Sequence, residues 1–153
     1  MKNLMIHVVL CLGVGFSATA AQAQDMPEMW IPIYGNWCGL DHPRSFDGAA
    51  APVDALDAAC MRHDYCAAAR GDFDCGCDIG LMGELRGTRW NNPVIAGNAR
   101  AIYDGIAMKP CSAPDGMAFK QSQMMGDMMR DMANGRPAPL DAVERWRRLL
   151  LGD

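Results

Sequence analysis

The residues best suited to chemistry stand together at 57–66, where the sequence reads DAACMRHDYC. A histidine and an aspartate, His63-Asp64, are bracketed by Cys60 and Cys66 in a stretch of helical character. At about 100° per residue, these four side chains fall within one arc of roughly 160° around a helix. A histidine oriented by a carboxylate on one ring nitrogen can take a proton from water with the other. The spacing therefore predicts one helix face that carries reactive groups and cysteine anchors together.

Two helices are predicted around this segment. The first begins near Pro52, since proline is tolerated in an opening turn, and it ends at Gly71. The second runs from about Asp74 or Cys75 to Arg86. Because only a four-residue turn separates them, the two helices should be antiparallel neighbours. The expected fold class is mainly α, with no or minimal β-structure.

The carboxylate expected to orient His63 is Asp78 on the second helix. Asp64 is rotated about 100° from His63 around the first helix, so it cannot easily bond the same ring and is freer to bind a metal ion. If Cys66 and Cys77 form a disulfide, the bridge clamps the two helices and brings Asp78 towards His63.

A loop with two glycines and one cysteine, YGNWCGLDHP at 34–43, precedes the helix pair. Such a backbone can turn its carbonyl oxygens inward, and carbonyls with a carboxylate are the ligands that calcium prefers. Without the neighbouring His63-Asp64 pair, an ordinary surface loop would be the simpler interpretation. The apolar segment 26–33 is interrupted by prolines and predicts an irregular strap or one helical turn.

Residues 1–23 have the features of a secretory signal peptide. They carry a basic Lys2, an apolar run over 4–16 and small residues before the expected cleavage point. The apolar run is shorter than the roughly 20 residues of a membrane span. Cleavage before Gln24 would leave one domain, 24–153, in a secreted or periplasmic protein.

Charge and cysteine content narrow the function classes. Loss of Lys2 leaves 13 of the 14 Lys and Arg residues against 18 Asp and Glu, so no nucleic-acid partner is expected. Cys11 leaves with the signal peptide, and the six remaining cysteines predict three disulfides in an oxidising compartment. Cys75 and Cys77 point roughly 200° apart on a helix and should serve different partners. Sequence alone leaves about 15 pairings open.

Four motifs occur in the order found in the secreted phospholipase A2 family, which the chain resembles. They are Tyr-Gly-x-x-Cys-Gly at 34–39, Pro-x-Asp-x-Leu-Asp-x-x-Cys at 52–60, Cys-x-x-His-Asp-x-Cys at 60–66 and Cys-x-Cys-Asp at 75–78. The resemblance implies a phospholipase A2-like domain with a catalytic core at about 34–86, a disulfide-linked helix pair, a calcium-binding loop and a helical C-terminal extension. It further implies calcium (Ca²⁺) as cofactor and a monomer that acts on a phospholipid membrane surface or micelle.

The implied reaction is hydrolysis of the sn-2 acyl ester of glycerophospholipids, which releases a fatty acid and a lysophospholipid. His63 would activate water, Asp78 would hold the tautomer of His63, and the N–H of Gly39 would stabilise the oxyanion together with calcium. The implied calcium ligands are Trp37, Gly39, Asp41 and Asp64. The family's disulfide pairing implies Cys38–Cys60 and Cys66–Cys77, which leaves Cys75–Cys111.

Two residues depart from the family's pattern. Asp41 stands where the family usually has a glycine in the calcium loop, so it must tolerate a positive φ or reshape the turn. Either its carbonyl or its carboxylate would then be the calcium ligand. Ala67 stands where many members supply a tyrosine to the orienting aspartate, and Tyr34, Tyr103 or a water is expected to replace it.

Two later segments have helical patterns. The Met-rich run 117–132 is interpreted as a core helix or as a flexible apolar surface beside a substrate channel. The segment 141–151 predicts an amphipathic helix opened by Asp141 and Glu144. That helix either docks on the core with its arginines in solvent or lies in a membrane interface, for which 30–33 is the rival surface.

Other function classes fit less well. The Cys-x-x-Cys spacing of zinc modules, the full ligand pattern of an EF-hand and the Gly-x-Ser-x-Gly of serine hydrolases do not occur. The alternative that remains is a non-catalytic lipid- or protein-binding module on the same scaffold. The intact His63, Asp64 and Asp78 argue against it, whereas Asp41 is its one support.

Overall fold

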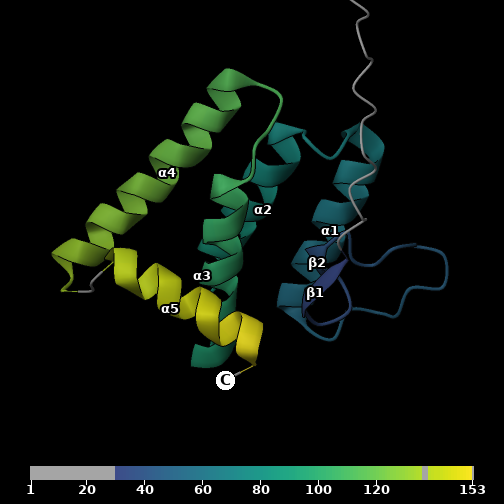
Figure 1. The fold of residues 1–153 in the computed structure, drawn as a ribbon, viewed down its shortest axis with the longest axis horizontal. Helices are drawn as coiled ribbons and strands as arrows, with labels where there is room; N and C mark the ends of the chain where they lie inside the picture. Colours follow the sequence, from purple (N-terminus) through teal and green to yellow (C-terminus); the bar gives the residue numbers. More distant parts are fainter. Residues whose placement is uncertain (1–29, 136–137, 153) are drawn as a thin grey trace, which may run out of the picture.

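The computed structural model describes residues 30–135 and 138–152, and it shows a mainly helical chain (Figure 1). Within these residues, a two-stranded sheet is followed by five helices. The expected mainly α fold with minimal β-structure is confirmed at that level. None of the described helices is both long and apolar enough to cross a membrane. The expected signal peptide, 1–23, lies outside the described residues.

The chain opens with a hairpin instead of the expected strap or helical turn. Strands β1 (Ile31–Tyr34) and β2 (Cys38–Leu40) pair antiparallel, with Pro32 opposite Gly39. Proline is tolerated here because each strand of a two-stranded ribbon has a free edge. A Cβ on Gly39 would lie 2.4 Å from the carbonyl oxygen of Ile31, so the close approach of the strands requires glycine.

The predicted helix pair is present and begins and ends at polar caps and a glycine. Helix α1 (Ala55–Arg70) follows Asp54, whose carboxylate accepts the N–H of Asp57 at 3.0 Å, and ends at Gly71 with φ of 104°. Helix α2 (Cys75–Gly87) follows the N-cap Asp74. The short connection folds α2 back against α1 (Figure 1). Local sequence signals therefore set the start of both helices and the end of α1.

Helix α3 (Pro93–Met108) is central, since it packs against α2, α4 (Pro114–Ala133) and α5 (Ala138–Leu151) (Figure 1). Proline occupies the first helical position of both α3 and α4, where no N–H is needed. The core lies among α1, α2, α3 and the hairpin. Its most buried apolar side chains include Leu56, Met82, Ala99, Ala101 and Ala107.

All six cysteines of the described residues form disulfides. Cys38–Cys60 ties β2 to α1, Cys66–Cys77 ties α1 to α2, and Cys75–Cys111 ties α2 to the connection between α3 and α4. Cys75 and Cys77 thus have different partners, as their positions on the helix predict. Cys38–Cys60 and Cys66–Cys77 are the pairs that the family resemblance implies, and Cys75–Cys111 is the pair that these two leave.

Helix α5 is docked on the core, but the expectation for its start and its arginines was wrong. It begins one turn before Asp141, whose carboxylate therefore pairs with Arg145 inside the helix and does not cap it. Arg145 is buried and also bonds Asp104 of α3 at 2.6 Å. Arg147 and Arg148 are exposed. A buried ion pair therefore anchors the helix together with its apolar face.

The Met-rich run divides between the two faces of α4. Met124 packs against the core, whereas Met125, Met129 and Met132 are exposed. None of the methionines lines the cavity described below. Neither interpretation of the run therefore holds for all of its residues.

A charged cluster around Asp127 joins α2, α3 and α4. Asp127 is 4 % exposed and accepts the hydroxyl of Tyr103 at 2.8 Å, with Arg86 and Arg130 on its other oxygen. Burial raises the pKa of Asp127, but the hydrogen bonds from Tyr103 and Arg130 and the charge of Arg86 lower it more, so the net shift is downward. The ionised form therefore stabilises the folded state.

We expect Asp127→Asn to weaken the dependence of stability on acid pH. Because the folded pKa lies below the unfolded one, Asp127 stabilises the protein above the unfolded value of about 3.9, and this contribution is lost as the pH falls through the folded pKa. At neutral pH the free energy of unfolding of the variant should be about 1–3 kcal/mol below that of wild type. On acidification the free energy of unfolding of the variant should fall by less than that of wild type. Urea unfolding across the acid range measures both. The exposed Asp115→Asn on the same helix serves as control, and parallel curves for wild type and Asp127→Asn would contradict the assignment.

Candidate active site

The site begins with the contact between α1 and α2. Nε2 of His63 lies 2.9 Å from Oδ1 of Asp78, which is in the first turn of α2 and has no exposed surface. Cys66–Cys77 joins the same two helices beside this contact. A carboxylate at Nε2 favours the tautomer with the proton on that nitrogen, which leaves Nδ1 as the acceptor. The structure therefore places Asp78 where an orienting carboxylate is expected.

Two lysines complete the surroundings of Asp78. Lys109, at the C-terminal end of α3, donates to Oδ1 at 2.9 Å, and Lys120 of α4 donates to Oδ2 at 2.5 Å. Lys120 is completely buried and also donates to the carbonyl of Lys109 at 2.7 Å. Both carboxylate oxygens are thus bonded to cations or to the imidazole. Lysines from α4 and from the end of α3 therefore hold the His63–Asp78 pair, here called the dyad.

Neither Tyr34 nor Tyr103 takes the place of the missing tyrosine. Tyr34 donates its hydroxyl to Asp54, and Tyr103 donates to Asp127. The sequence did contain a signal for the lysines. After Lys2 the chain uses lysine only at 109 and 120 and arginine at its eleven other basic positions, and both lysines contact the same carboxylate.

These contacts shift the pKa values of both His63 and Asp78. Burial raises the pKa of Asp78, but the hydrogen bonds from His63, Lys120 and Lys109 lower it more, so the carboxyl stays ionised. Burial lowers the pKa of His63, and Lys109 lowers it further, but the hydrogen bonds of Asp64 and Asp78 raise it above its ordinary value. Asp78 is therefore a fixed negative charge next to a histidine whose protonated form is favoured.

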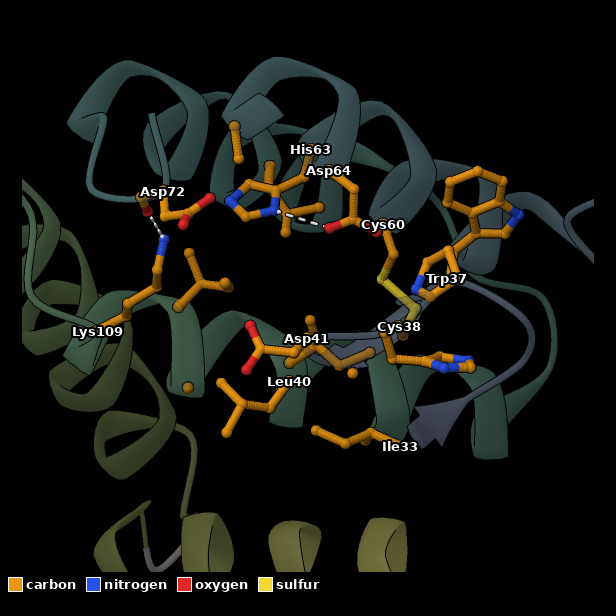
Figure 2. Close-up of a pocket in the computed structure, with 18 of the residues that line it drawn as sticks. Ile33, Trp37, Cys38, Leu40, Asp41, Cys60, His63, Asp64, Asp72 and Lys109 are labelled. Atoms are coloured by element: carbon orange, nitrogen blue, oxygen red, sulfur yellow. Dashed lines mark hydrogen bonds and ion pairs between the residues drawn. A yellow bond between two sulfur atoms is a disulfide. The ribbon is translucent and has the colours of Figure 1, made fainter. Parts of the chain in front are cut away.

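Asp64 lies closer to the ring than helix geometry predicts. Its Oδ1 is 3.5 Å from Nδ1 of His63, so the expected separation of the two groups is wrong in this structure (Figure 2). Its Oδ2 is buried and has no hydrogen-bond partner among the described residues. Burial raises the pKa of Asp64, partly offset by His63. A buried carboxylate oxygen without a partner is costly unless it receives a cation or a donor.

The loop that faces Asp64 is shaped by Asp57 of α1. The carboxylate of Asp57 has no exposed surface and accepts the backbone N–H groups of Asn36, Trp37 and Val53 at 2.8–2.9 Å. A Cβ on Gly35, whose φ is 59°, would lie 2.3 Å from the Asp57 carboxyl carbon. The glycine and the buried carboxylate therefore fix the loop together, a role that sequence reasoning did not assign to Asp57.

We expect Asp57→Ala to destabilise the fold by about 3 kcal/mol. It removes one acceptor from three backbone donors and leaves buried N–H groups without a partner, each of which costs about 1–3 kcal/mol. Urea unfolding measures the change, with the exposed loop variant Asp47→Ala as control. Equal stability of the two variants would show that Asp57 does not hold the loop.

Asp41 takes the conformation that a glycine position requires. Its φ is 49°, the only positive value for a non-glycine residue in the described part of the chain. The positive φ is the first of the two options for this departure, and aspartate tolerates it better than most residues. Figure 2 shows the Asp41 side chain across the cavity from His63, so its carboxylate is available at the site.

The donor set fits a hard cation. Residues 37–41 and Asp64 line the same cavity, and they offer backbone carbonyl oxygens, the Asp41 carboxylate and the Asp64 oxygen that has no partner among the described residues. These are the ligand types that calcium prefers. Among the residues that the structure describes, no three His, Cys, Asp or Glu side chains are grouped so that they could hold a metal ion by themselves. Main-chain oxygens would therefore have to supply most of the ligands.

These groups open into a cavity of about 420 Å³ between α1, α3, β2 and α5 (Figure 2). Its polar lining side chains are Asp41, His42, His63, Asp64, Asp72 and Lys109. The remaining lining is largely apolar and includes Leu40, Leu81, Ile102 and Ile106. The cavity therefore joins a small polar region to a larger apolar one, which suits an amphiphilic ligand.

Comparisons with known proteins do not assign the chain to a family. No family model, no curated protein and no solved structure matches the chain. The case for a function therefore rests on the four motifs and on the residues that the fold brings together.

Proposed function

We propose that the chain is a calcium-dependent phospholipase that hydrolyses the sn-2 acyl ester of glycerophospholipids. The observation that carries this proposal is the arrangement of the His63 ring. Asp78 lies on Nε2, and Nδ1 faces the cavity beside Asp64, whose second oxygen is buried and has no partner in the described part of the chain. A general base, the carboxylate that orients it and a cation ligand thus meet in the polar part of a largely apolar cavity.

The chain's own residues supply the proton chemistry. Nδ1 of His63 accepts a proton from the attacking water, and the proton then passes to the leaving alkoxide. Asp78 keeps the ring in position and stabilises the imidazolium by its negative charge. Because Lys109 and Lys120 hold Asp78 ionised, the proton stays on the histidine during the step.

The cation would act on the substrate carbonyl. Bound calcium supplies a Lewis acid that stabilises negative charge on the ester oxygen. Trp37, Gly39 and Asp41 would hold it through backbone oxygens, or through the Asp41 carboxylate, and Asp64 through its side chain. The N–H of Gly39 would donate to the same ester oxygen.

The partner is a phospholipid membrane surface or a micelle. Leu40 lines the cavity and is 48 % exposed, and Trp30 at the start of the hairpin is 43 % exposed. Apolar side chains at such positions can enter a lipid interface while the ester reaches His63. Three disulfides are compatible with an extracellular location, where we propose that the chain acts as a monomer.

We expect the protein to hydrolyse phosphatidylcholine vesicles in calcium and to lose at least about 100-fold of its rate in excess chelator, since the cation stabilises the transition state by several kcal/mol. Asp64→Asn should show the same loss in calcium, because it removes a charged ligand. Release of free fatty acid measures both. The control Asp47→Asn changes an exposed carboxylate in a loop outside the cavity lining and should behave as wild type.

Hydrolysis that persists in chelator would overturn the calcium mechanism. Absence of hydrolysis, with vesicle binding retained, would instead favour a non-catalytic lipid-binding module on the same scaffold.

A further inference from the structure

The C-terminal helix forms one wall of the cavity. Trp146 of α5 lines it together with Gly105 and Ile106 of α3. Figure 2 shows α5, in yellow, along the side of the cavity opposite α1. The four motifs end before residue 80, so they give no information about this wall.

Trp146 is held in a fixed position. A Cβ on Gly105 would lie 2.4 Å from Cζ2 and 3.0 Å from Cη2 of the indole, so the ring packs directly on the backbone of α3. The adjacent Arg145 bonds Asp104 at 2.6 Å, and Leu149 on the next turn is 6 % exposed. The indole is thus a rigid part of the wall.

The two polar groups of α1 and the apolar side chains near α5 lie on different sides of the cavity. His63 and Asp64 project from α1, whereas Ile33 and Leu40 lie between that helix and α5 (Figure 2). The Asp41 carboxylate lies across the cavity from His63, beside Leu40 (Figure 2). Trp146 lines the cavity from α5. An acyl chain whose ester lies at His63 would therefore extend from α1 past Asp41 and along apolar side chains towards α5.

We propose that Trp146 closes the apolar end of the cavity and sets the longest acyl chain that fits inside it. The inference rests on the proposed function for its choice of occupant, a single acyl chain. Each methylene that enters the cavity gains affinity through burial of apolar surface. Methylenes that would extend beyond Trp146 remain in water and gain none.

The test uses n-alkylphosphocholines of stepwise increasing chain length, below their critical micelle concentrations and with calcium present. These ligands have no carboxylic ester, so the proposed reaction cannot cleave them and binding is read without hydrolysis. Isothermal titration calorimetry on wild type should show the Kd falling about fourfold per methylene up to a limiting length and then levelling off. In Trp146→Ala the limit should move to longer chains, and in Trp146→Phe it should move by less. Val143→Ala, at a position on α5 that is 68 % exposed, should keep the wild-type limit.

Three outcomes would overturn the inference. They are an unchanged limiting length in Trp146→Ala, an affinity loss that is uniform over all chain lengths, and no binding of any chain by wild type. Thermal unfolding of each variant checks that the fold is intact. If the alanine variant does not fold, the limiting chain length of Trp146→Phe is compared with that of wild type instead. A clear limiting length in a protein that hydrolyses no phospholipid would overturn the proposed activity alone.

Discussion

His63→Gln should reduce phospholipid hydrolysis in calcium by about 10²–10⁴-fold and leave the fold intact. Glutamine can still donate to Asp78, which His63 contacts at 2.9 Å, but it cannot accept a proton from water at neutral pH. The loss should therefore appear in kcat, with little change in vesicle binding. Fatty-acid release measures the rate, and circular dichroism with thermal unfolding reports the fold.

The matched control for this variant is Arg62→Gln. Arg62 is the preceding residue on α1, has an exposed side chain and pairs with Glu84 outside the cavity lining. It should retain the wild-type rate. Since the neutral imidazole is the base, the wild-type rate should also rise as the pH passes upward through the pKa of His63. Activity in His63→Gln equal to that of Arg62→Gln would exclude His63 as the base.

Lys120→Met should lower the free energy of unfolding by about 3 kcal/mol and reduce kcat. It removes a completely buried cation from the carboxylate of Asp78, and loss of one partner from a buried ion pair typically costs about 3–5 kcal/mol. Lys109 and His63 remain bonded to Asp78, so the lower end of that range applies. Urea unfolding measures the stability, and the vesicle assay measures kcat.

Gln121→Met, at the next and exposed position of α4, controls for the introduced methionine and should be close to wild type. Lys109→Met should be milder than Lys120→Met, because the Lys109 side chain is 29 % exposed. Full stability in Lys120→Met would show that the buried ion pair contributes nothing net. A wild-type kcat in a stable Lys120→Met would show that Lys120 does not position the dyad.

The elements that sequence reasoning predicted well carry their signals locally. Asp54 and Asp74 cap α1 and α2, and Gly71 ends α1 in a positive φ that favours glycine. Periodicity placed His63 and Cys66 on one face of α1, opposite Asp78 and Cys77 of α2. The two caps and the glycine stand at the helix boundaries themselves, so the local sequence reveals them.

The hairpin was missed because its causes are not local. Pro32 argues against a strand within its own segment. The pairing of β1 with β2 is nevertheless supported by the disulfide Cys38–Cys60 and by Asp57, which accepts two N–H groups of the intervening turn. These partners come from α1. A propensity taken one segment at a time cannot include them.

The charged groups of the C-terminal half were missed for the same reason. Lys120 lies 42 residues from Asp78 in sequence, and the pair forms only once α4 packs on α2. Arg145 was expected in solvent but bonds Asp104, 41 residues away. Buried ion pairs of this kind depend on tertiary packing, and the amphipathic pattern of a helix does not reveal them.

In the proposed reaction, His63 and the loop at 37–41 direct water to one ester of a phospholipid. A phosphatidylcholine with different acyl chains at sn-1 and sn-2, with mass spectrometry of the products in calcium and in chelator, tests this choice of ester. We expect release of the sn-2 chain with the matching lysophospholipid, in calcium only. Release of the sn-1 chain, equal release in chelator or no release at all would contradict the proposed reaction.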